Sequence, residues 1–159
     1  EISDKHQEIA RTLSIDFGAT SAEYIVNKEG IWPIEFANRG GGVCISSIVN
    51  PVISGLDTCQ QLVADSQGKS EQRRFERTKK YAYLKYINLK PGRIKNLHVC
   101  DIQNQGVIFT KIWSKPGDII SSITDAYGRS GVVITCSDDA DEAIELAQEF
   151  INRIEVTYE

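Results

Sequence analysis

Apolar and polar positions alternate most clearly in two short runs, residues 21–26 and 31–36, which are rich in β-branched and aromatic residues. The four residues between them read Asn-Lys-Glu-Gly, and this arrangement predicts an antiparallel β-hairpin. A three-residue loop with its glycine in the left-handed conformation would pair Asn27 with Ile31. That register collects a wholly apolar face, whereas a two-residue loop mixes the faces. The predicted apolar face consists of Ala22, Tyr24, Val26, Trp32, Ile34 and Phe36.

In this register Glu23 lies directly opposite Glu35 on the other face of the hairpin. Directly opposed residues have Cβ atoms roughly 5 Å apart, so two like charges there are destabilising unless a positive group lies between them. Mg²⁺ takes one or two carboxylates and completes its shell with water and phosphate oxygens. The second strand leads to Arg39, whose guanidinium can bind phosphate or carboxylate. Three consecutive glycines follow, beginning with Gly40 and Gly41, and there the backbone can approach a ligand closely. The alternative is that both glutamates face solvent and that the glycines form a flexible loop.

Two helices are predicted in the rest of the first half. The first spans residues 4–13 and starts near Ser3 or Asp4, with His6 on its polar, solvent-facing side. The second spans roughly 58–65 and is capped by the residues before it, which end in Asp57.

The second half alternates short strands with glycine turns, which predicts a small antiparallel sheet or sandwich. The expected strands are 81–87, 94–99, 107–113, 119–124, 132–136 and 155–158. One helix is predicted after the Ser-Asp-Asp cap at 137–139, because apolar residues then recur at steps of three and four. These apolar positions are Ala140, Ala143, Ile144, Ala147, Phe150, Ile151 and Ile154. Residues 69–80 hold six basic and two acidic residues, and we interpret them as a solvated connector rather than a nucleic-acid patch.

Composition excludes several functional classes. The chain has 159 residues, 41% of them hydrophobic, which suits one domain or two small ones. A net charge of −4 argues against a general nucleic-acid or anionic-membrane surface. No apolar run approaches the ~18 residues of a spanning helix, and no signal-peptide pattern begins the chain, so a cytoplasmic protein is expected. The chain has no Met, and we therefore expect a fragment of a longer protein.

The cysteines are widely spaced and include no Cys-x-x-Cys pair. We expect buried free thiols rather than a zinc site. The four positions are Cys44, Cys59, Cys100 and Cys136.

The pattern Glu-x₁₁-Glu-x₃-Arg across a hairpin, followed by three glycines and by Ser-Gly-Leu-Asp at 54–57, resembles the last part of the ATP-grasp ligase core. The resemblance implies that Glu23 and Glu35 bind Mg²⁺ (or Mn²⁺) and, with Gly40 and Gly41, the phosphates of ATP. It assigns Arg39 to the acyl phosphate or the substrate carboxylate, as the catalytic residue. Many members have Asn two residues after the second Glu. The sequence departs from that pattern, since Ala37 stands there and Asn38 lies one place further on.

The resemblance also implies an α+β fold in two parts. Residues 1–68 would be the C-terminal part of the ATP-grasp core, an antiparallel sheet with covering helices, one of them in 43–49 and ended by Asn50 and Pro51. Residues 69–80 would be a linker, and residues 81–159 the α+β domain that follows many such cores. Arg129 in that domain is interpreted as a turn residue, with a position near the active site as the alternative.

The implied activity is that of an ATP-dependent carboxylate–amine ligase, which activates a carboxylate as an acyl phosphate for attack by an amine. Its partners would be small-molecule carboxylates and amines and the rest of the parent chain, with no nucleic acid and no membrane. The nucleotide-gripping lysines of the family lie upstream of such a segment, so this chain alone is expected to be inactive. Two alternatives stay open. One is a carboxylase-type member, and the other is a non-catalytic binding module that uses 81–159 to form a homodimer, which Ala37 favours.

Overall fold

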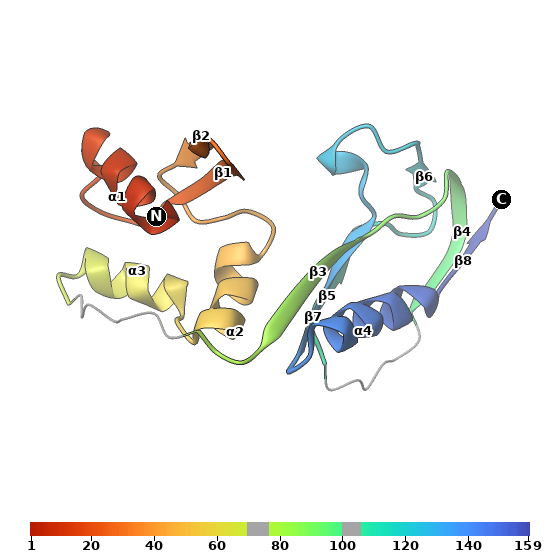
Figure 1. Cartoon of the computed structure of the whole chain (residues 1–159). Helices are drawn as coiled ribbons and strands as arrows, with labels where there is room; N and C mark the ends of the chain where they lie inside the picture. Colours follow the sequence, from red (N-terminus) through yellow and green to blue (C-terminus); the bar gives the residue numbers. More distant parts are fainter. Residues whose placement is uncertain (70–76, 100–105) are drawn as a thin grey trace. The chain divides into compact units, whose positions relative to one another are not determined.

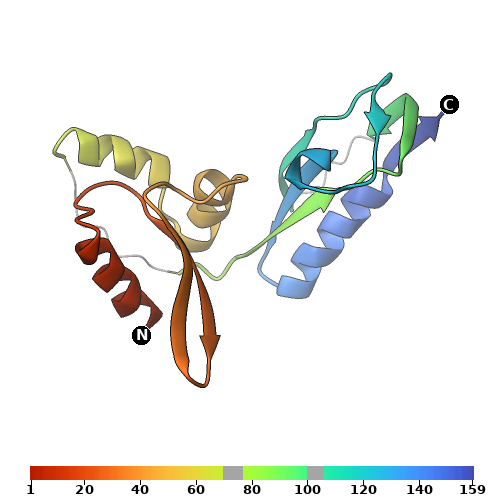
Figure 2. The ribbon, with the colours of Figure 1, turned by 90° about the horizontal axis from the view of Figure 1, so that it is seen from above.

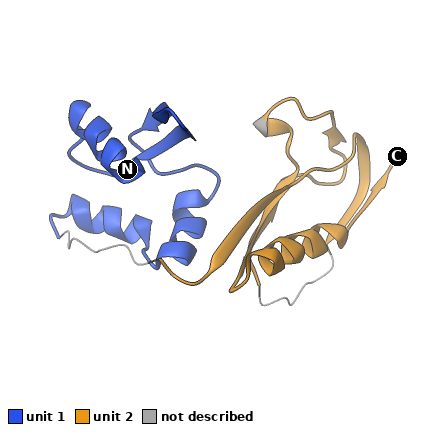
Figure 3. Cartoon of the chain, viewed as in Figure 1, with its two compact units in different colours: residues 1–76 blue, residues 77–159 orange. Residues whose placement is uncertain are grey.

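The structure is a computed structural model that describes residues 1–69, 77–99 and 106–159 (Figure 1). The chain divides into two compact units, Glu1–Glu76 and Arg77–Glu159 (Figure 3). Helices and antiparallel strands occur in both, so the fold is α+β as predicted. Residues 70–76 of the expected linker, and Cys100, lie outside the described residues.

Unit 1 combines one hairpin with short helices. Its elements are α1 (Ile2–Thr12), β1 (Ser21–Asn27), β2 (Gly30–Ala37), the π-helix η1 (Ile45–Val49), α2 (Asn50–Ser54) and α3 (Thr58–Ser66). The predicted start of the first helix is wrong, because α1 begins at Ile2 without a side-chain cap. The helix expected in 43–49 does not end at Pro51, since proline is tolerated in the first turn of α2. The cap of α3 is confirmed, because Asp57 Oδ1 accepts from Gln60 N at 2.9 Å.

The hairpin has a shorter loop than predicted. Asn27 pairs with Gly30, so the loop has two residues, and the predicted three-residue loop is wrong. The side-chain oxygen of Asn27 accepts from the backbone N–H of Glu29 at 2.9 Å and of Gly30 at 3.1 Å, which closes this tighter turn. In Figure 2 the hairpin projects as a two-stranded ribbon.

A β-bulge further along the hairpin then changes the register. Tyr24 pairs with Pro33 and Glu23 pairs with Glu35, so Ile34 is the extra residue on β2. Between the loop and the bulge, Trp32 lies opposite Ile25 and does not share a face with Tyr24. The predicted apolar face is therefore wrong over this stretch.

His6 connects α1 to the hairpin. Its Nε2 lies 2.7 Å from Thr20 Oγ1, its Nδ1 lies 3.0 Å from the hydroxyl of Tyr24, and its ring centroid is 4.7 Å from that of Phe36. The prediction of a solvated His6 is therefore wrong.

Within its described residues, unit 2 contains two three-stranded sheets. They have the orders β3-β7-β5 and β6-β4-β8, and the described pairings are all antiparallel, as predicted. The strands are β3 (Tyr81–Ile87), β4 (Gly92–Val99), β5 (Val107–Ile112), β6 (Ile119–Ile120), β7 (Gly131–Ser137) and β8 (Ile154–Tyr158). The strand expected at 119–124 is cut to two residues. Asp125 instead caps the 3-10 helix η2 (Ala126–Gly128) by accepting from Tyr127 N and Gly128 N.

Helix α4 (Ala140–Asn152) packs on β3 and β7 and builds the core of unit 2 (Figure 1). The core cluster joins Ile87 and Val133 of the sheet to Ala147 and Phe150 of the helix. The predicted spacing is confirmed for the buried residues of α4, but Ile144 on the same helix is 43% exposed. The helix ends at Asn152, and Ile154 already belongs to β8.

Candidate functional site

The predicted site residues meet at one cavity in unit 1. Glu23, Glu35, Arg39 and Gly41 all line this cavity, which has a volume of 270 Å³ and is called the hairpin cavity below. Its lining is completed by Ser21, Ala22, Gly42, Val43 and Ile45. Gly40 does not line it directly, and neither does Asn38, whose Oδ1 lies beside Gly18.

The β-bulge at Ile34 brings the two carboxylates face to face. The two-residue loop alone would continue a register in which Glu23 opposes Ile34 and Glu35 opposes Ala22. Since side chains alternate along a strand, the two glutamates would then lie on opposite faces. The extra residue shifts β2 by one position, and Glu23 pairs directly with Glu35. The predicted pairing is thus confirmed, although the loop that predicted it is wrong.

Arg39 contacts one of these carboxylates. Its Nη2 donates to Glu35 Oε1 at 3.2 Å, and its Nη1 donates to the carbonyl of Gly40 at 3.1 Å. The side chains of the ion pair are 60% and 56% exposed. An exposed pair of this kind contributes only about 0–1 kcal/mol, so a phosphate or carboxylate can compete for the guanidinium at little cost.

Close packing accounts for two of the three glycines. A Cβ at Gly40 would lie 2.6 Å from Ser46 Oγ, and a Cβ at Gly41 would lie 3.1 Å from Ile45 Cγ2. The glycine backbone therefore rests directly on η1. This contact opposes the interpretation of residues 40–42 as merely a flexible loop.

The donor set at the hairpin cavity consists of two carboxylates. Over residues 1–69, 77–99 and 106–159, no group of three or more His, Cys, Asp or Glu side chains is arranged to hold a metal ion. A site with only two carboxylates matches Mg²⁺, which keeps waters and binds substrate phosphates, better than a metal that needs a full protein cage. Glu23 and Glu35 are the residues here that fit such an ion.

The remaining candidates lie elsewhere. The guanidinium of Arg129 stacks on Tyr86 in its own unit, with Cζ 3.6 Å from the ring centroid. The expectation of buried thiols is wrong for Cys59, which is exposed, whereas Cys44 and Cys136 are half-buried and free. Burial raises the pKa of the Cys136 thiol, and Lys80 partly offsets this shift. No helix within the described residues is long and apolar enough to cross a membrane.

Residues 85–159 match a family model described as L-amino acid ligase C-terminal domain 2. No curated protein matches the chain significantly in sequence. Several solved structures share its fold. A phosphoribosylglycinamide synthetase from Anaerococcus prevotii has 16% identity and a TM-score of 0.82, with 96% of this chain and 40% of that chain covered. An L-amino acid ligase from Bacillus licheniformis has 19% identity and a TM-score of 0.80, with 99% of this chain and 40% of that chain covered.

A third solved structure is the biotin carboxylase domain dimer of Hydrogenobacter thermophilus 2-oxoglutarate carboxylase, in complex with MgADP, ADP and bicarbonate. It has 18% identity and a TM-score of 0.63, with 88% of this chain and 32% of that chain covered. The chain spans two fifths of the length of the first two structures and a third of the last. The match over residues 85–159 and the fold shared along almost the whole chain agree with the resemblance to the C-terminal part of an ATP-grasp ligase.

Proposed function

We propose that the chain is the C-terminal part of an ATP-dependent carboxylate–amine ligase, with residues 1–68 as the end of the catalytic core and 81–159 as the following domain. The observation that carries this proposal is the direct pairing of Glu23 with Glu35 in the cavity that Arg39 also lines. Two opposed carboxylates require a positive partner, and among the described residues a single exposed arginine forms an ion pair with one of them.

Mg²⁺ or Mn²⁺ bound by Glu23 and Glu35 would supply charge neutralisation at the transferred phosphoryl group of ATP. The two carboxylates would be the protein ligands of the ion, and the open side of the cavity leaves room for phosphate oxygens. The complex of the Hydrogenobacter carboxylase domain with MgADP supports a magnesium nucleotide as the ligand class for this fold.

Arg39 has the role of binding the carboxylate substrate. Its guanidinium presents a planar pair of N–H donors that matches a carboxylate or phosphate, and its bond to Glu35 is weak enough to exchange. Backbone N–H groups near Gly41 would stabilise negative charge on the acyl phosphate. A substrate carboxylate oxygen attacks the γ-phosphorus and ADP leaves. An amine then attacks the acyl carbon, loses a proton, and releases phosphate.

The carboxylate substrate that we propose is an L-amino acid. The family match to an L-amino acid ligase domain over residues 85–159 supports this class. The TM-scores of 0.82 and 0.80 for the synthetase and the ligase, against 0.63 for the carboxylase domain, show that the fold of this chain is more similar to the first two.

Glu35→Gln in the intact parent ligase tests the proposal. Amino-acid-dependent formation of ADP should fall about 100-fold or more, because a neutral amide cannot replace a carboxylate that binds the metal nucleotide. Glu29→Gln is the matched control, since Glu29 lies in the exposed hairpin loop and does not line the cavity; its rate should stay at the wild-type value. Unchanged ADP formation by Glu35→Gln would reject the proposal.

A further inference from the structure

The turn after the three glycines has an uncommon backbone. Val43 has φ +47° and Cys44 has φ +62°, in the left-handed region that L-residues rarely adopt. The N–H of Ile45 donates to the carbonyl of Gly42 at 3.0 Å and closes a four-residue turn around these two residues. Two central residues with positive φ are the pattern of a type I′ turn, in which Gly, Asn and Asp dominate. A β-branched residue such as Val43 is strained there.

Glycines lie directly before this turn but do not occupy its two positions with positive φ. Residues 40–42 are all glycine, and none of the three has a positive φ. A Cβ on Gly42 would meet nothing within 4 Å, so packing does not explain glycine at that position. The strain falls on Val43 and Cys44, although a shift of the turn by two residues would place it on glycines. Such strain persists only where the surrounding structure imposes it.

Three contacts hold the turn in place. The backbone of Gly40 and Gly41 packs on Ser46 and Ile45. The carbonyl of Cys44 accepts from Ile48 N at 2.9 Å and Val49 N at 3.1 Å, which begins the π-helix η1. The hydroxyl of Thr58 donates to the carbonyl of Ser46. π-turns inside helical segments occur frequently at functional sites.

The strained turn gives the hairpin cavity an apolar side. Val43 and Ile45, each 43% exposed, line the cavity together with the charged residues Glu23, Glu35 and Arg39. A guanidinium and an apolar wall in one small cavity suit a carboxylic acid that carries an apolar group near its carboxylate.

We propose that the turn at Val43 and Cys44 is a positioning device and that Val43 determines specificity for an amino acid with an apolar side chain. The inference rests on the proposed ligase function and deepens it. The turn is strained because it must present a β-branched side chain, and not a glycine, to the substrate.

The strain is tested on the 159-residue chain itself, independently of any activity. Val43→Gly and Cys44→Gly should raise the midpoint of thermal unfolding by about 4 °C, because glycine adopts positive φ without a penalty. Val49→Gly is the matched control. Val49 has φ −65° and ψ −50°, so glycine there should lower the midpoint. A lower midpoint in all three variants would overturn the claim of strain.

The specificity role is tested in the intact parent ligase with Val43→Thr. Threonine keeps the β-branch and hence the strain, and changes only the polarity of the wall. The ratio of kcat/KM for L-leucine to that for L-serine, read from ADP formation, should fall about 10-fold. Val63→Thr on the exposed face of α3 is the control and should leave the ratio unchanged.

The outcomes separate the two proposals. Wild-type ADP formation with an unchanged ratio in Val43→Thr would overturn the specificity role and leave the ligase proposal standing. No amino-acid-dependent ADP formation by the wild type would overturn the ligase function and with it the substrate role of Val43, and the unfolding midpoints would still decide whether the turn is strained.

Discussion

The two units of the chain differ in how they are stabilised. Over the described residues, every hydrophobic residue that is buried belongs to unit 2, and the only buried residue of unit 1 is Ser54. The buried hydrophobic residues are Ile87, Ile94, Val132, Val133, Ile134, Ala143, Ala147 and Phe150. In unit 1 the hairpin instead exposes large apolar side chains by 53% to 61%, namely Ile25, Val26, Trp32 and Ile34. Unit 2 therefore has a core of its own, whereas unit 1 leaves large apolar side chains on its surface.

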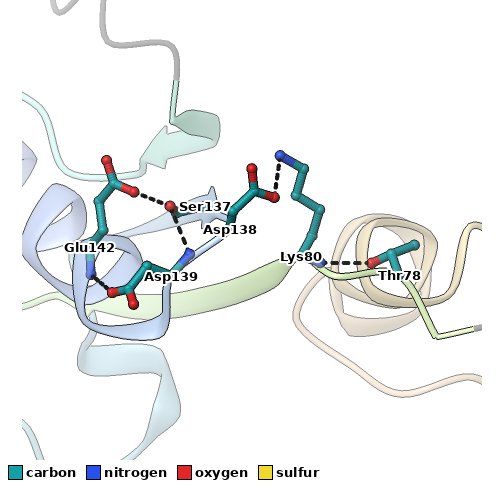
Figure 4. Close-up of polar contacts among 6 residues, drawn as sticks. All are labelled: Thr78, Lys80, Ser137, Asp138, Asp139 and Glu142. Atoms are coloured by element: carbon teal, nitrogen blue, oxygen red, sulfur yellow. Dashed lines mark hydrogen bonds and ion pairs between the residues drawn. The ribbon is translucent and has the colours of Figure 1, made fainter.

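Polar contacts reinforce unit 2 where its core helix begins (Figure 4). Asp139 caps α4 by accepting from Glu142 N at 2.9 Å, and the hydroxyl of Ser137 accepts from Asp139 N at 3.1 Å. The ammonium of Lys80 lies 2.8 Å from Asp138 Oδ1, which connects the start of β3 to the turn before α4. Hydrogen bonds and an ion pair thus join the start of β3, the turn at 137–139 and the start of α4 in unit 2.

This difference matters because the proposed site lies on the less packed unit. Ligand-binding loops belong to the parts of proteins with low local stability. The hairpin cavity lies in this less packed unit, and the exposed ion pair between Arg39 and Glu35 can open when a ligand binds the guanidinium.

Replacing a core aromatic residue should have the largest effect on this comparison. Phe150→Ala should lower the free energy of unfolding of unit 2 by about 3–5 kcal/mol, because it leaves a cavity under α4. Trp32→Ala in the hairpin should cost less than about 1 kcal/mol, because its side chain is half-exposed. Urea titration followed by circular dichroism measures both. Equal losses would show that unit 1 has a core after all.

Removal of helix caps gives a matched pair of smaller effects. Asp139 and Asp57 each accept a backbone N–H at 2.9 Å, at α4 and α3 respectively. Each change to Ala should cost about 1 kcal/mol, and only in the unit that contains the helix. The chain has two tryptophans, Trp32 in unit 1 and Trp113 in unit 2. Variants that keep one tryptophan, made with Trp32→Phe or Trp113→Phe, therefore report the unfolding transition of one unit at a time. A shift of both transitions by one cap would contradict independent units.

Alkaline pH should produce the smallest effect, in unit 2. Burial raises the pKa of Cys136 above its ordinary value of 9.0, and the hydrogen bond to Asp138 raises the pKa of Lys80 above 10.5. A raised pKa means that the folded state holds its proton more tightly than the unfolded chain does. The contribution of Cys136 to folding stability is full below about pH 9 and is lost as pH rises through its folded pKa. The contribution of Lys80 is lost in the same way above about pH 10.5. Thermal midpoints between pH 8 and 11 should decline, and Cys136→Ala should remove the first part of that decline.

Local patterns predicted much of unit 2 but less of unit 1. The spacing of Ala143, Ala147 and Phe150 predicts the buried side of α4, because a helix that packs on a sheet needs an apolar stripe of period 3.6. In the hairpin, the pattern assumed that apolar residues gather on one face. The pairing of Trp32 with Ile25, on the face opposite to Tyr24, shows that they do not, so the argument for a three-residue loop failed.

The pairing of Glu23 with Glu35 was predicted through two errors that cancel. The loop is one residue shorter than predicted, and the bulge at Ile34 adds one residue on β2. A bulge depends on how the whole ribbon twists and packs, and no short segment of sequence specifies it. The contacts of His6 with Thr20 and Tyr24 were missed for a similar reason, since they join residues 14 and 18 positions apart.

The amino-acid sequence by itself determined the kinds of elements, the hairpin with its acidic and basic residues, and the α+β class, because turns, caps and periodicities act over a few residues. Only the tertiary structure decided that the two carboxylates share a face with Arg39 beside them, and that Val43 and Cys44, and not the neighbouring glycines, take the left-handed turn. The first depends on a bulge in the ribbon, and the second on the packing of η1 against the glycine backbone. Local propensity encodes neither of them.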